Sequence, residues 1–350
     1  MKPDYQKKLQ EQGSNDIQNV SLSTTNEPQL VSLPCWDTIH LGLNADEVPD
    51  ISLLEEITSR LAENGCGTFT SKSGNHRWYA NLDNLKITVT DKSVTIQGSI
   101  WKWYMGNNLH NITLADTQNA LGQLSEIIGL PIERFYIDRV DLAANLIMEN
   151  PAEAYFLHLG IIEKGNVLPL PYPHGIYYDL PGKPLHKASL FFYSKDNEMR
   201  ARKKRMPAEW IGLHVLRYEY RKYPLLTTAD ALYKKEFYDG LVKQWIEHYD
   251  RIVKQNDVIL NFEEIQSKKD LSKLGTLALC QKVDGGNKAI EQIEQARKMG
   301  KLTSKQAYDY RKAIIQANEA DGRLTVISPL IEELNNKIDI AYRNGIQLLD

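Results

Sequence analysis

Three segments of this chain alternate apolar and polar side chains, with the period of two that a half-buried β-strand shows. They are residues 137–143, 189–195 and 215–221. One side of each segment is aliphatic or aromatic, and the other side carries Arg139 and Asp141, Tyr193 and Lys195, or Arg217, Glu219 and Arg221. One apolar side is typical of an antiparallel sheet that buries a single face. The pattern therefore predicts an α+β fold, in which helices pack on one face of an antiparallel sheet.

The predicted elements divide the chain into three parts. Residues 1–32 are rich in Gln, Asn, Ser and Lys and offer little to bury, which predicts a mobile arm. Residues 33–227 mix strands and helices and predict the α+β domain, whereas residues 228–350 predict an all-α domain for DNA binding or oligomerisation. The strands expected before residue 228 are 35–43, 86–90, 94–103, 134–147, 187–195 and 214–221, with helices at 51–63, 113–128 and 152–160 and a Pro/Gly-rich loop at 169–183.

Polar residues mark the starts of two helices. Thr113 followed by Asp116 gives a capping-box start, and Gly129 marks the end of that helix. Thr303 followed by Gln306 gives another such start, inside a helix, turn and helix over residues 287–318. Such a pair either reads duplex DNA or is a packing unit, and both interpretations stay open.

Composition and charge exclude several classes of protein. The 350 residues include 42 basic and 45 acidic side chains, and a formal net charge of −3 is not that of a polycation that coats DNA. Three cysteines without a CxxC spacing exclude a disulfide framework and a zinc knuckle. No apolar run approaches the ~18 residues of a membrane span, and the N-terminus lacks the apolar core of a signal peptide. We therefore expect a cytoplasmic protein with no membrane partner. The motifs of P-loop ATPases, HExxH zinc enzymes, dinucleotide-binding GxGxxG proteins and GxSxG hydrolases are absent.

The polar sides of the three segments carry the residue types of a phosphoryl-transfer site. Two carboxylates can hold a hard cation such as Mg²⁺ or Mn²⁺ through oxygen. A tyrosine hydroxyl can act as a nucleophile, and lysine or arginine can stabilise the charge of a transition state. The alternative is a solvated strand face with cross-strand ion pairs, which is the commoner origin of such alternation.

The same residues resemble the motifs of the gene II replication proteins of filamentous phages, a family of rolling-circle replication initiators that includes plasmid Rep proteins. The family shows S-R-I-D on one strand, Y-x-K followed by Glu on another, and R-[FY]-E-x-R on a third. Here these motifs read Asp138-Arg139-Val140-Asp141, Tyr193-Ser194-Lys195 with Glu198, and Arg217-Tyr218-Glu219-Tyr220-Arg221. An early strand around Asp37 and the passage 98–108 extend the resemblance, which covers residues 35–225. Asp138 departs from the serine of the family and carries no assigned role.

The resemblance implies a metal-dependent, site-specific nickase and strand-transferase at a replication origin. Tyr193 would attack the scissile phosphate, form a 5′-phosphotyrosine and free a 3′-OH primer, and later rejoining would need no ATP. Lys195 would assist the tyrosine, and Asp141 and Glu219, with Asp37 as a further ligand, would hold Mg²⁺ or Mn²⁺. The implied partners are origin DNA, single-stranded or as an extruded hairpin, together with a host helicase and polymerase. A homodimer is a further expectation.

Basic residues around these strands are the candidates for DNA contact. The run 200–205 holds five basic residues in six, and Lys102 lies among Trp101, Trp103 and Tyr104, a composition suited to stacking on unpaired bases. The candidate DNA-binding residues are Arg139, Arg217, Arg221, Lys102, Arg200, Arg202, Lys203, Lys204 and Arg205. A solvated loop at 200–205 and buried tryptophans at 101 and 103 are the alternatives.

Two other functions compete with the nickase. A sequence-specific DNA-binding initiator or repressor would open an origin without cutting it, so neither a metal nor Tyr193 would matter to it. A conjugative relaxase is disfavoured, because the chain has no His-hydrophobic-His triplet. Among the other tyrosines, Tyr218 and Tyr220 lie on the apolar side and are expected to pack, and Tyr104 is the alternative nucleophile.

Overall fold

A computed structural model describes most of the chain after residue 30. The described residues are 31–44, 57, 59, 67–70, 76–90, 92–162, 166–169, 175–180, 182, 187–258, 262–283, 285–318 and 324–348. The arm predicted at 1–32 and the helix predicted at 51–63 lie almost wholly outside these residues. Contacts group Val31–Asp350 into one compact unit.

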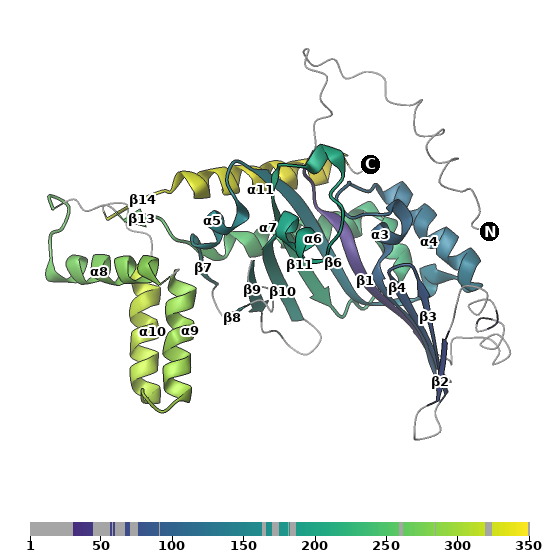
Figure 1. The fold of residues 1–350 in the computed structure, drawn as a ribbon, viewed down its shortest axis with the longest axis horizontal. Helices are drawn as coiled ribbons and strands as arrows, with labels where there is room; N and C mark the ends of the chain where they lie inside the picture. Colours follow the sequence, from purple (N-terminus) through teal and green to yellow (C-terminus); the bar gives the residue numbers. More distant parts are fainter. Residues whose placement is uncertain are drawn as a thin grey trace, which may run out of the picture. The chain divides into compact units, whose positions relative to one another are not determined.

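A ten-stranded antiparallel sheet organises the described residues (Figure 1). Its strand order is β2-β3-β4-β5-β1-β6-β11-β10-β9-β8. The three segments with alternating side chains lie in β6, β11 and β10, which are neighbours in this order. The predicted α+β class with an antiparallel sheet is confirmed. The bounds are β1 Cys35–Asn44, β2 Gly67–Thr70, β3 His76–Leu82, β4 Leu85–Thr90, β5 Ser93–Ser99, β6 Tyr136–Met148, β8 Asn166–Pro169, β9 Gly175–Leu180, β10 Lys187–Ser194 and β11 His214–Tyr223.

Helices cover the apolar face of this sheet. Phe192 of β10 stacks on Tyr218 of β11 with ring centroids 4.4 Å apart, and Tyr218 lies 4.6 Å from Trp245 of α7 (Lys235–Asp250). The long helix α11 (Pro329–Leu348) contacts α7 and β6. Helix α4 (Leu114–Ile128) contacts the 3₁₀ turn Ala229–Tyr233, which leads into α7. The aromatic and aliphatic sides of β10 and β11 are therefore core, as the alternation predicts.

The predicted capping signals are present at both helix starts. The Thr113 side chain accepts a hydrogen bond from the Asp116 amide, and Asp116 accepts in return from the Thr113 amide. Gly129 ends α4 with φ 80°, a left-handed conformation that glycine adopts without strain. Thr303 and Gln306 form the same reciprocal pair before α10 (Ser304–Asn318).

Two expected strands end early because a serine starts a helix. Ser99 accepts from the Lys102 amide and begins α3 (Ile100–Met105), so residues 100–103 are helix where the strand 94–103 was expected. Ser194 likewise accepts from the Asn197 amide and begins α6 (Lys195–Ala201), so Lys195 belongs to a helix rather than to β10. A serine cap outweighs the local strand pattern at both positions.

Two other elements differ from the sequence expectation. The segment expected as a loop at 169–183 contains β9, because Tyr178 and Leu180 alternate into the core while β9 pairs with β10. The helix expected at 152–160 is shorter: α5 (Ala152–Phe156) is followed by β7 (Leu159–Ile162), which pairs with β12 (Ile252–Lys254). The proline and glycine content of 169–183 concealed a short alternating run.

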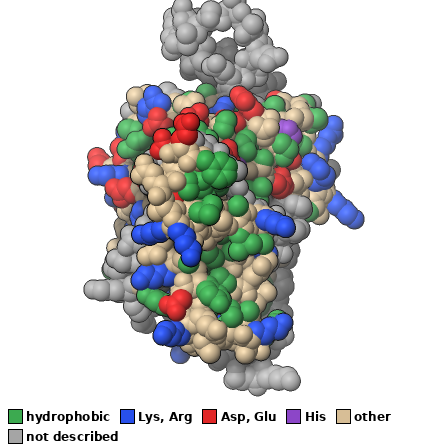
Figure 2. All heavy atoms as spheres, turned by 90° about the vertical axis from the view of Figure 1, so that its left-hand side faces the viewer, with side chains coloured by type: hydrophobic (Ala, Val, Ile, Leu, Met, Phe, Trp, Pro, Cys, Tyr) green, Lys and Arg blue, Asp and Glu red, His purple; other side chains and the backbone are tan. Residues whose placement is uncertain are grey.

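The helices after residue 227 have two roles. Helices α7 and α11 pack on the sheet, whereas α8 (Lys268–Lys282), α9 (Gly286–Lys298) and α10 contact one another around a small cluster of their own. Helices α9 and α10 form the predicted helix, turn and helix, and the domain boundary near residue 227 stays a prediction. Figure 2 views the molecule from the left-hand side of Figure 1, where α8, α9 and α10 lie, and shows exposed hydrophobic side chains among Lys and Arg. Within the described residues, no helix has the length and apolar character needed to cross a membrane.

Candidate functional site

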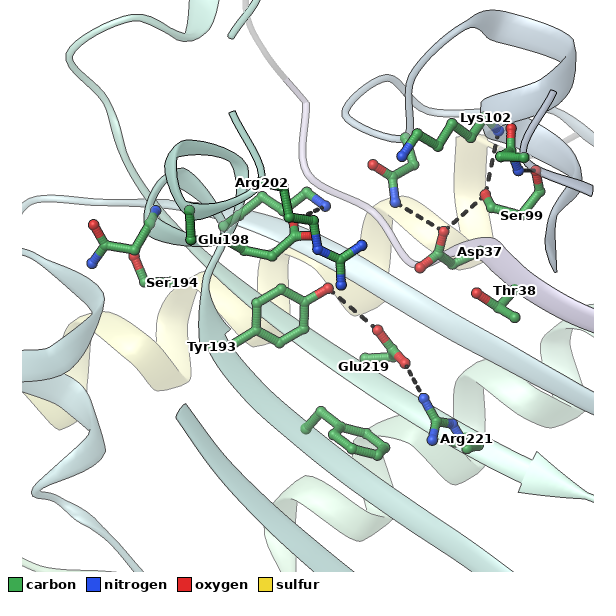
Figure 3. A pocket seen from close by; sticks show the side chains of 16 residues that line it. Asp37, Thr38, Ser99, Lys102, Tyr193, Ser194, Glu198, Arg202, Glu219 and Arg221 are labelled. Carbon is green, nitrogen blue, oxygen red and sulfur yellow. Dashed lines mark hydrogen bonds and ion pairs between the residues drawn. The ribbon is translucent and has the colours of Figure 1, made fainter. Parts of the chain in front are cut away.

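A cavity of about 510 Å³ lies over the polar side of the sheet (Figure 3). Its walls come from β1, β10 and β11, from α3 with the loop that follows it, and from α6. The predicted site residues that line it are Asp37, Lys102, Tyr193, Lys195, Arg202, Glu219 and Arg221. Candidates from distant parts of the sequence therefore meet in one cavity.

Strand register brings the catalytic candidates to one side. Tyr193 of β10 is the register partner of Arg217 of β11, and Arg221 of β11 is the partner of Asp141 of β6. Directly opposed residues on antiparallel strands project from the same face. Glu219 lies between the two arginines at the same parity of β11. The shared polar face that the alternation predicted is confirmed.

Asp37 reaches the cavity from an irregular part of β1. The register between β1 and β6 shifts between Trp36 and Ile39, which leaves Asp37 and Thr38 without register partners on β6. A β-bulge redirects side chains in this way, and both residues line the cavity although they are adjacent in sequence. Trp36 points to the core, where its indole donates to the Leu232 carbonyl.

A buried ion pair fixes Asp37 beside the site. Arg217 Nη2 lies 2.7 Å from Asp37 Oδ2, and only 2% of the arginine and 6% of the aspartate surface is exposed. Burial acts to raise the pKa of Asp37, but Arg217 and Lys195, with hydrogen bonds from Asn108 and Ser99, bring it below its ordinary value. Asp37 is therefore held as a carboxylate in a largely dry environment.

Tyr193 presents its hydroxyl to Glu219. The hydroxyl donates to Glu219 Oε2 at 3.4 Å, and Figure 3 shows the ring directed into the cavity. Burial raises the pKa of Tyr193 well above 10; Glu219 and Asp37 add to this effect, while Arg217 opposes it. The hydroxyl is therefore protonated at neutral pH and needs a proton acceptor to become a nucleophile.

Glu219 is placed to exchange that proton. Burial, followed by the nearby Asp141 and Asp37 carboxylates, raises the pKa of Glu219 to about 8, although Arg221 and Arg217 act in the opposite direction. Its Oε1 accepts a hydrogen bond from Arg221 Nη2 at 3.1 Å. A carboxyl group that titrates near neutral pH next to a tyrosine hydroxyl is suited to general acid and base chemistry.

Asp141 is held by arginines beneath the site. It is fully buried and accepts hydrogen bonds from Arg139 and, at 3.1 Å, from Arg221 Nε. Asp141 and Arg139 do not line the cavity. In this arrangement Asp141 orients Arg221. All three arginines expected to contact DNA from β6 and β11, Arg139, Arg217 and Arg221, are engaged with carboxylates.

The carboxylates give a partial fit to a metal site. Within the described residues, no three His, Cys, Asp or Glu side chains converge as a metal-binding group. Asp37 and Glu219 do line one cavity, on either side of Arg217, and hard divalent cations prefer such oxygen donors. Burial, followed by the nearby Asp141 and Asp37 carboxylates, raises the pKa of Glu219, and a cation would offset the negative charge. These two residues suit a divalent cation, whose binding stays a prediction.

Lys195 reaches the cavity from the first turn of α6. Its Nζ lies 2.7 Å from Glu198 Oε2, and the side chain is almost fully buried. Burial and the nearby Arg217 lower the pKa of Lys195, while Glu198 and Asp37 act to raise it. The nitrogen is 6.0 Å from the centre of the Tyr193 ring. The predicted proximity to Tyr193 therefore holds, although the element differs.

The basic candidates on α3, on α6 and in the turn after α6 divide between the cavity and the surface beyond it. Lys102 and Arg202 line it, and Arg202 Nε pairs with Glu198 Oε1 at 2.8 Å. Arg200 pairs with Asp196 at 3.4 Å, and the exposed part of the turn comprises Lys203, Lys204 and Arg205. Burial, followed by the adjacent Lys204, lowers the pKa of Lys102 to about 8.

The aromatic residues around Lys102 do not all face DNA. Trp101 is 3% exposed and belongs to the core, so packing was the right interpretation for it. Trp103 and Tyr104 are half-buried and pack against the same core. These residues lie on helix α3 and not on the strand expected at 94–103.

Sequence reasoning missed the groups that fix the charged residues. Ser99 Oγ and Asn108 Nδ2 each donate to Asp37 Oδ1 at 3.0 Å. Arg217 Nη1 donates to Asn145 Oδ1 at 2.8 Å and to the Asn108 carbonyl at 3.2 Å. The parity of β6 marked Asn145 as a neighbour of Asp141, but nothing local to Asn108 or Ser99 revealed a partner about 60–70 residues away in sequence.

The part of the chain that carries this sheet and cavity matches one family. The family described as the N-terminal part of the phage replication-associated protein of gene II type matches residues 31–237, which is more than half of the chain. The chain belongs to this family of phage replication-associated proteins. The matched range includes all ten strands of the sheet and ends in the first turn of α7. The resemblance to gene II replication proteins is thereby confirmed. No curated protein matches the chain.

Proposed function

We propose that this phage replication-associated protein initiates rolling-circle replication by nicking one DNA strand at an origin, with Tyr193 as the nucleophile. The observation that carries the proposal is the position of the Tyr193 hydroxyl, 3.4 Å from Glu219 in a cavity bordered by basic side chains. Membership of a replication family supplies the substrate class, and the cavity supplies a nucleophile, a proton acceptor and cationic groups.

The chain's own residues account for each change of bonding. The Tyr193 proton passes to the Glu219 carboxylate as the phenolic oxygen bonds to the scissile phosphorus. The bond from phosphorus to the 3′ oxygen breaks, and that oxygen takes a proton from water. Lys195 and Arg221 stabilise the negative charge on the phosphate oxygens. The product is a 5′-phosphotyrosine and a free 3′-OH.

Rejoining is the same reaction in reverse. A 3′-OH attacks the phosphotyrosine, and Tyr193 leaves with a proton returned by Glu219. The phosphodiester energy is retained in the protein-DNA bond, so ATP is not required. Asp37 and Glu219 would hold Mg²⁺ or Mn²⁺, which would polarise a phosphate oxygen. A host helicase and polymerase would use the unwound strand and the 3′ primer.

The decisive experiment is a search for the covalent intermediate. The full chain is incubated with supercoiled DNA of its own replicon and Mg²⁺ or Mn²⁺, then denatured, and the DNA is examined for protein attached to a 5′ end. We expect an adduct at Tyr193 in the native protein and none in Tyr193→Phe, while both bind the DNA. Mn²⁺ binding, followed by electron paramagnetic resonance, should weaken in Asp37→Asn.

Tyr104→Phe is the matched control, because Tyr104 is the competing nucleophile and is half-buried on the nearby α3. It should form the adduct at the native level. An undiminished adduct in Tyr193→Phe would overturn the proposal. Specific binding with no adduct under either metal would instead favour an initiator that opens DNA without cutting it.

A further inference from the structure

A second, smaller cavity lies on the other side of α6. Its volume is about 270 Å³, and its walls include Met199, Met206, Trp210, Ile211 and Leu213. Arg200 and Lys204 of the basic turn border it. The cavity is below the ~300–1,000 Å³ of sites for drug-sized ligands, and its volume suits one planar ring system.

Helix α6 and the basic turn join this cavity to the one that holds Tyr193. Along α6, Glu198 lines the first cavity while Met199 lines the second. In the turn that follows, Arg202 lines the first and Lys204 the second. Cationic groups thus continue from one cavity to the other, as a phosphate backbone would require.

Trp210 gives the second cavity an unused hydrogen-bond donor. Its side chain is 4% exposed, and its indole Nε1 is buried with no hydrogen-bond partner among the described residues. A buried donor without a partner costs ~1–3 kcal/mol, so such groups in native proteins call for an explanation. A ligand in the cavity that carries a hydrogen-bond acceptor would remove this cost once the indole turns to expose Nε1, which has almost no accessible surface in the unliganded protein.

We propose that the second cavity binds the base of an unpaired nucleotide that adjoins the cleavage site, with Trp210 as donor and Lys204 on its phosphate. Apolar and aromatic walls suit the faces of a base, the indole suits its carbonyl or ring nitrogen, and the basic rim suits the backbone. A base in a duplex is stacked and paired and does not reach the buried Trp210. The subsite therefore selects single-stranded DNA. This inference rests on the proposed function.

The test separates base recognition from phosphate recognition and needs no knowledge of the origin. The probes are a 12-nucleotide oligodeoxythymidine and a 12-unit abasic strand with the same phosphates. Fluorescence anisotropy gives the dissociation constant of each strand for the full chain. The measured quantity is the dissociation constant of the abasic strand divided by that of the thymidine strand. Since one stacked base contributes ~1–3 kcal/mol, we expect the native protein to bind the thymidine strand at least ~5-fold more tightly.

Two neutral changes in the cavity should reduce this ratio. Trp210→Phe keeps the ring but removes the donor, and Ile211→Ala removes part of a wall that is 68% exposed, so the latter should fold normally. Each should lower the ratio at least ~3-fold. Leu226→Ala, at a leucine that is 81% exposed and lines neither cavity, is the matched control and should leave the ratio unchanged. Lys204→Met should weaken both strands and reduce the salt slope by ~1.

A purely structural tryptophan gives a different result. If Trp210→Phe lowers the melting temperature but leaves the ratio at the native value, the indole belongs to the core and the proposal is wrong. Equal binding of the two strands by the native protein also overturns it. If the native protein forms the Tyr193 adduct but the cavity variants leave the ratio unchanged, only the subsite proposal is wrong. A reduced ratio in both variants, with no adduct on origin DNA, would defeat only the nicking.

Discussion

Tyr193 and Tyr218 lie on neighbouring strands but on opposite faces of the sheet, and the same side chain has a different environment on each face. Tyr218 of β11 opposes Phe192, and Tyr193 of β10 opposes Arg217. The Tyr218 ring stacks on Phe192, and its hydroxyl donates to the Trp245 carbonyl at 2.9 Å. The Tyr193 hydroxyl instead makes a long contact with a carboxyl group in a cavity.

Strand parity, rather than residue type, decides which tyrosine is available for chemistry. On the apolar face, Tyr218 is fully buried and its hydroxyl donates to a backbone carbonyl, so its interactions contribute to stability. On the polar face, burial, with Glu219 and Asp37 adding to it, holds the pKa of Tyr193 high, and Glu219 offers the hydroxyl an acceptor. The apolar face therefore stabilises the protein, and the polar face gathers paired charges around a tyrosine hydroxyl that makes only a long hydrogen bond.

The largest expected effect tests whether the polar face also contributes to stability. Arg217→Met leaves the Asp37 carboxylate buried without its guanidinium partner. Breaking a buried pair from one side costs ~3–5 kcal/mol, and we expect a loss of that size in the free energy of unfolding. Urea denaturation with a constant m-value measures it.

Arg221→Met is the matched control for that change. Arg221 is 23% exposed in its side chain, and Asp141 keeps Arg139 after the substitution. The loss should be clearly smaller, about 1–2 kcal/mol. Equal losses for the two arginines would mean that the Asp37 pair is not the stabilising element of the polar face.

A smaller effect separates the two tyrosines directly. Tyr218→Phe removes the hydrogen bond that the hydroxyl donates to the Trp245 carbonyl, which should lower the free energy of unfolding by ~0.5–1.5 kcal/mol and leave adduct formation intact. Tyr193→Phe removes only a long contact and should change stability by less than ~0.5 kcal/mol while abolishing the adduct. Parallel unfolding curves and adduct assays give both quantities, and a reversed pattern would break the comparison.

The shared polar face was predictable because alternate side chains of a strand project from opposite faces. Once the apolar residues are assigned to the core, the residues between them must lie on the other face. Tyr193, Glu219 and Arg221 were placed together on that ground. The bulge at Asp37 and Thr38 was not predictable, since it depends on how β1 pairs with β6 about 100 residues later. Lys195 was expected on the strand but reaches the cavity from helix α6, which Ser194 caps. The alternating pattern did not reveal this helix start.

Asn108 and Asn145 show the same limit from the side of hydrogen bonding. Both accept hydrogen bonds from Arg217 Nη1, and neither has a neighbour in sequence that identifies this role. A buried guanidinium requires acceptors, but the sequence does not say which ones. The residues proposed to react were therefore easier to bring together from the sequence than the residues that hold them in place.

The smallest expected effect concerns acid, and it arises on the apolar face. His248 of α7 lies against the Tyr220 ring, with centroids 5.2 Å apart, and accepts a hydrogen bond from Arg251. Burial, followed by the nearby Arg251 and Lys222, lowers the pKa of His248 to about 4. In the unfolded chain the pKa of His248 is near its ordinary value of 6.5. Between pH 4 and 6.5 the unfolded chain therefore binds a proton at His248 that the folded protein does not bind.

Because the unfolded state binds more protons between pH 4 and 6.5, the free energy of unfolding falls as the pH falls through this window. His248→Gln should reduce the slope of stability against pH there by up to about one proton, measured by urea denaturation at several pH values. His40 on β1 gives the comparison, since burial and Arg139 lower its pKa to about 4 as well. His40→Gln should also reduce the slope of the free energy of unfolding against pH between pH 4 and 6.5. If neither substitution changes this slope, the acid sensitivity comes from the carboxylates of the polar face.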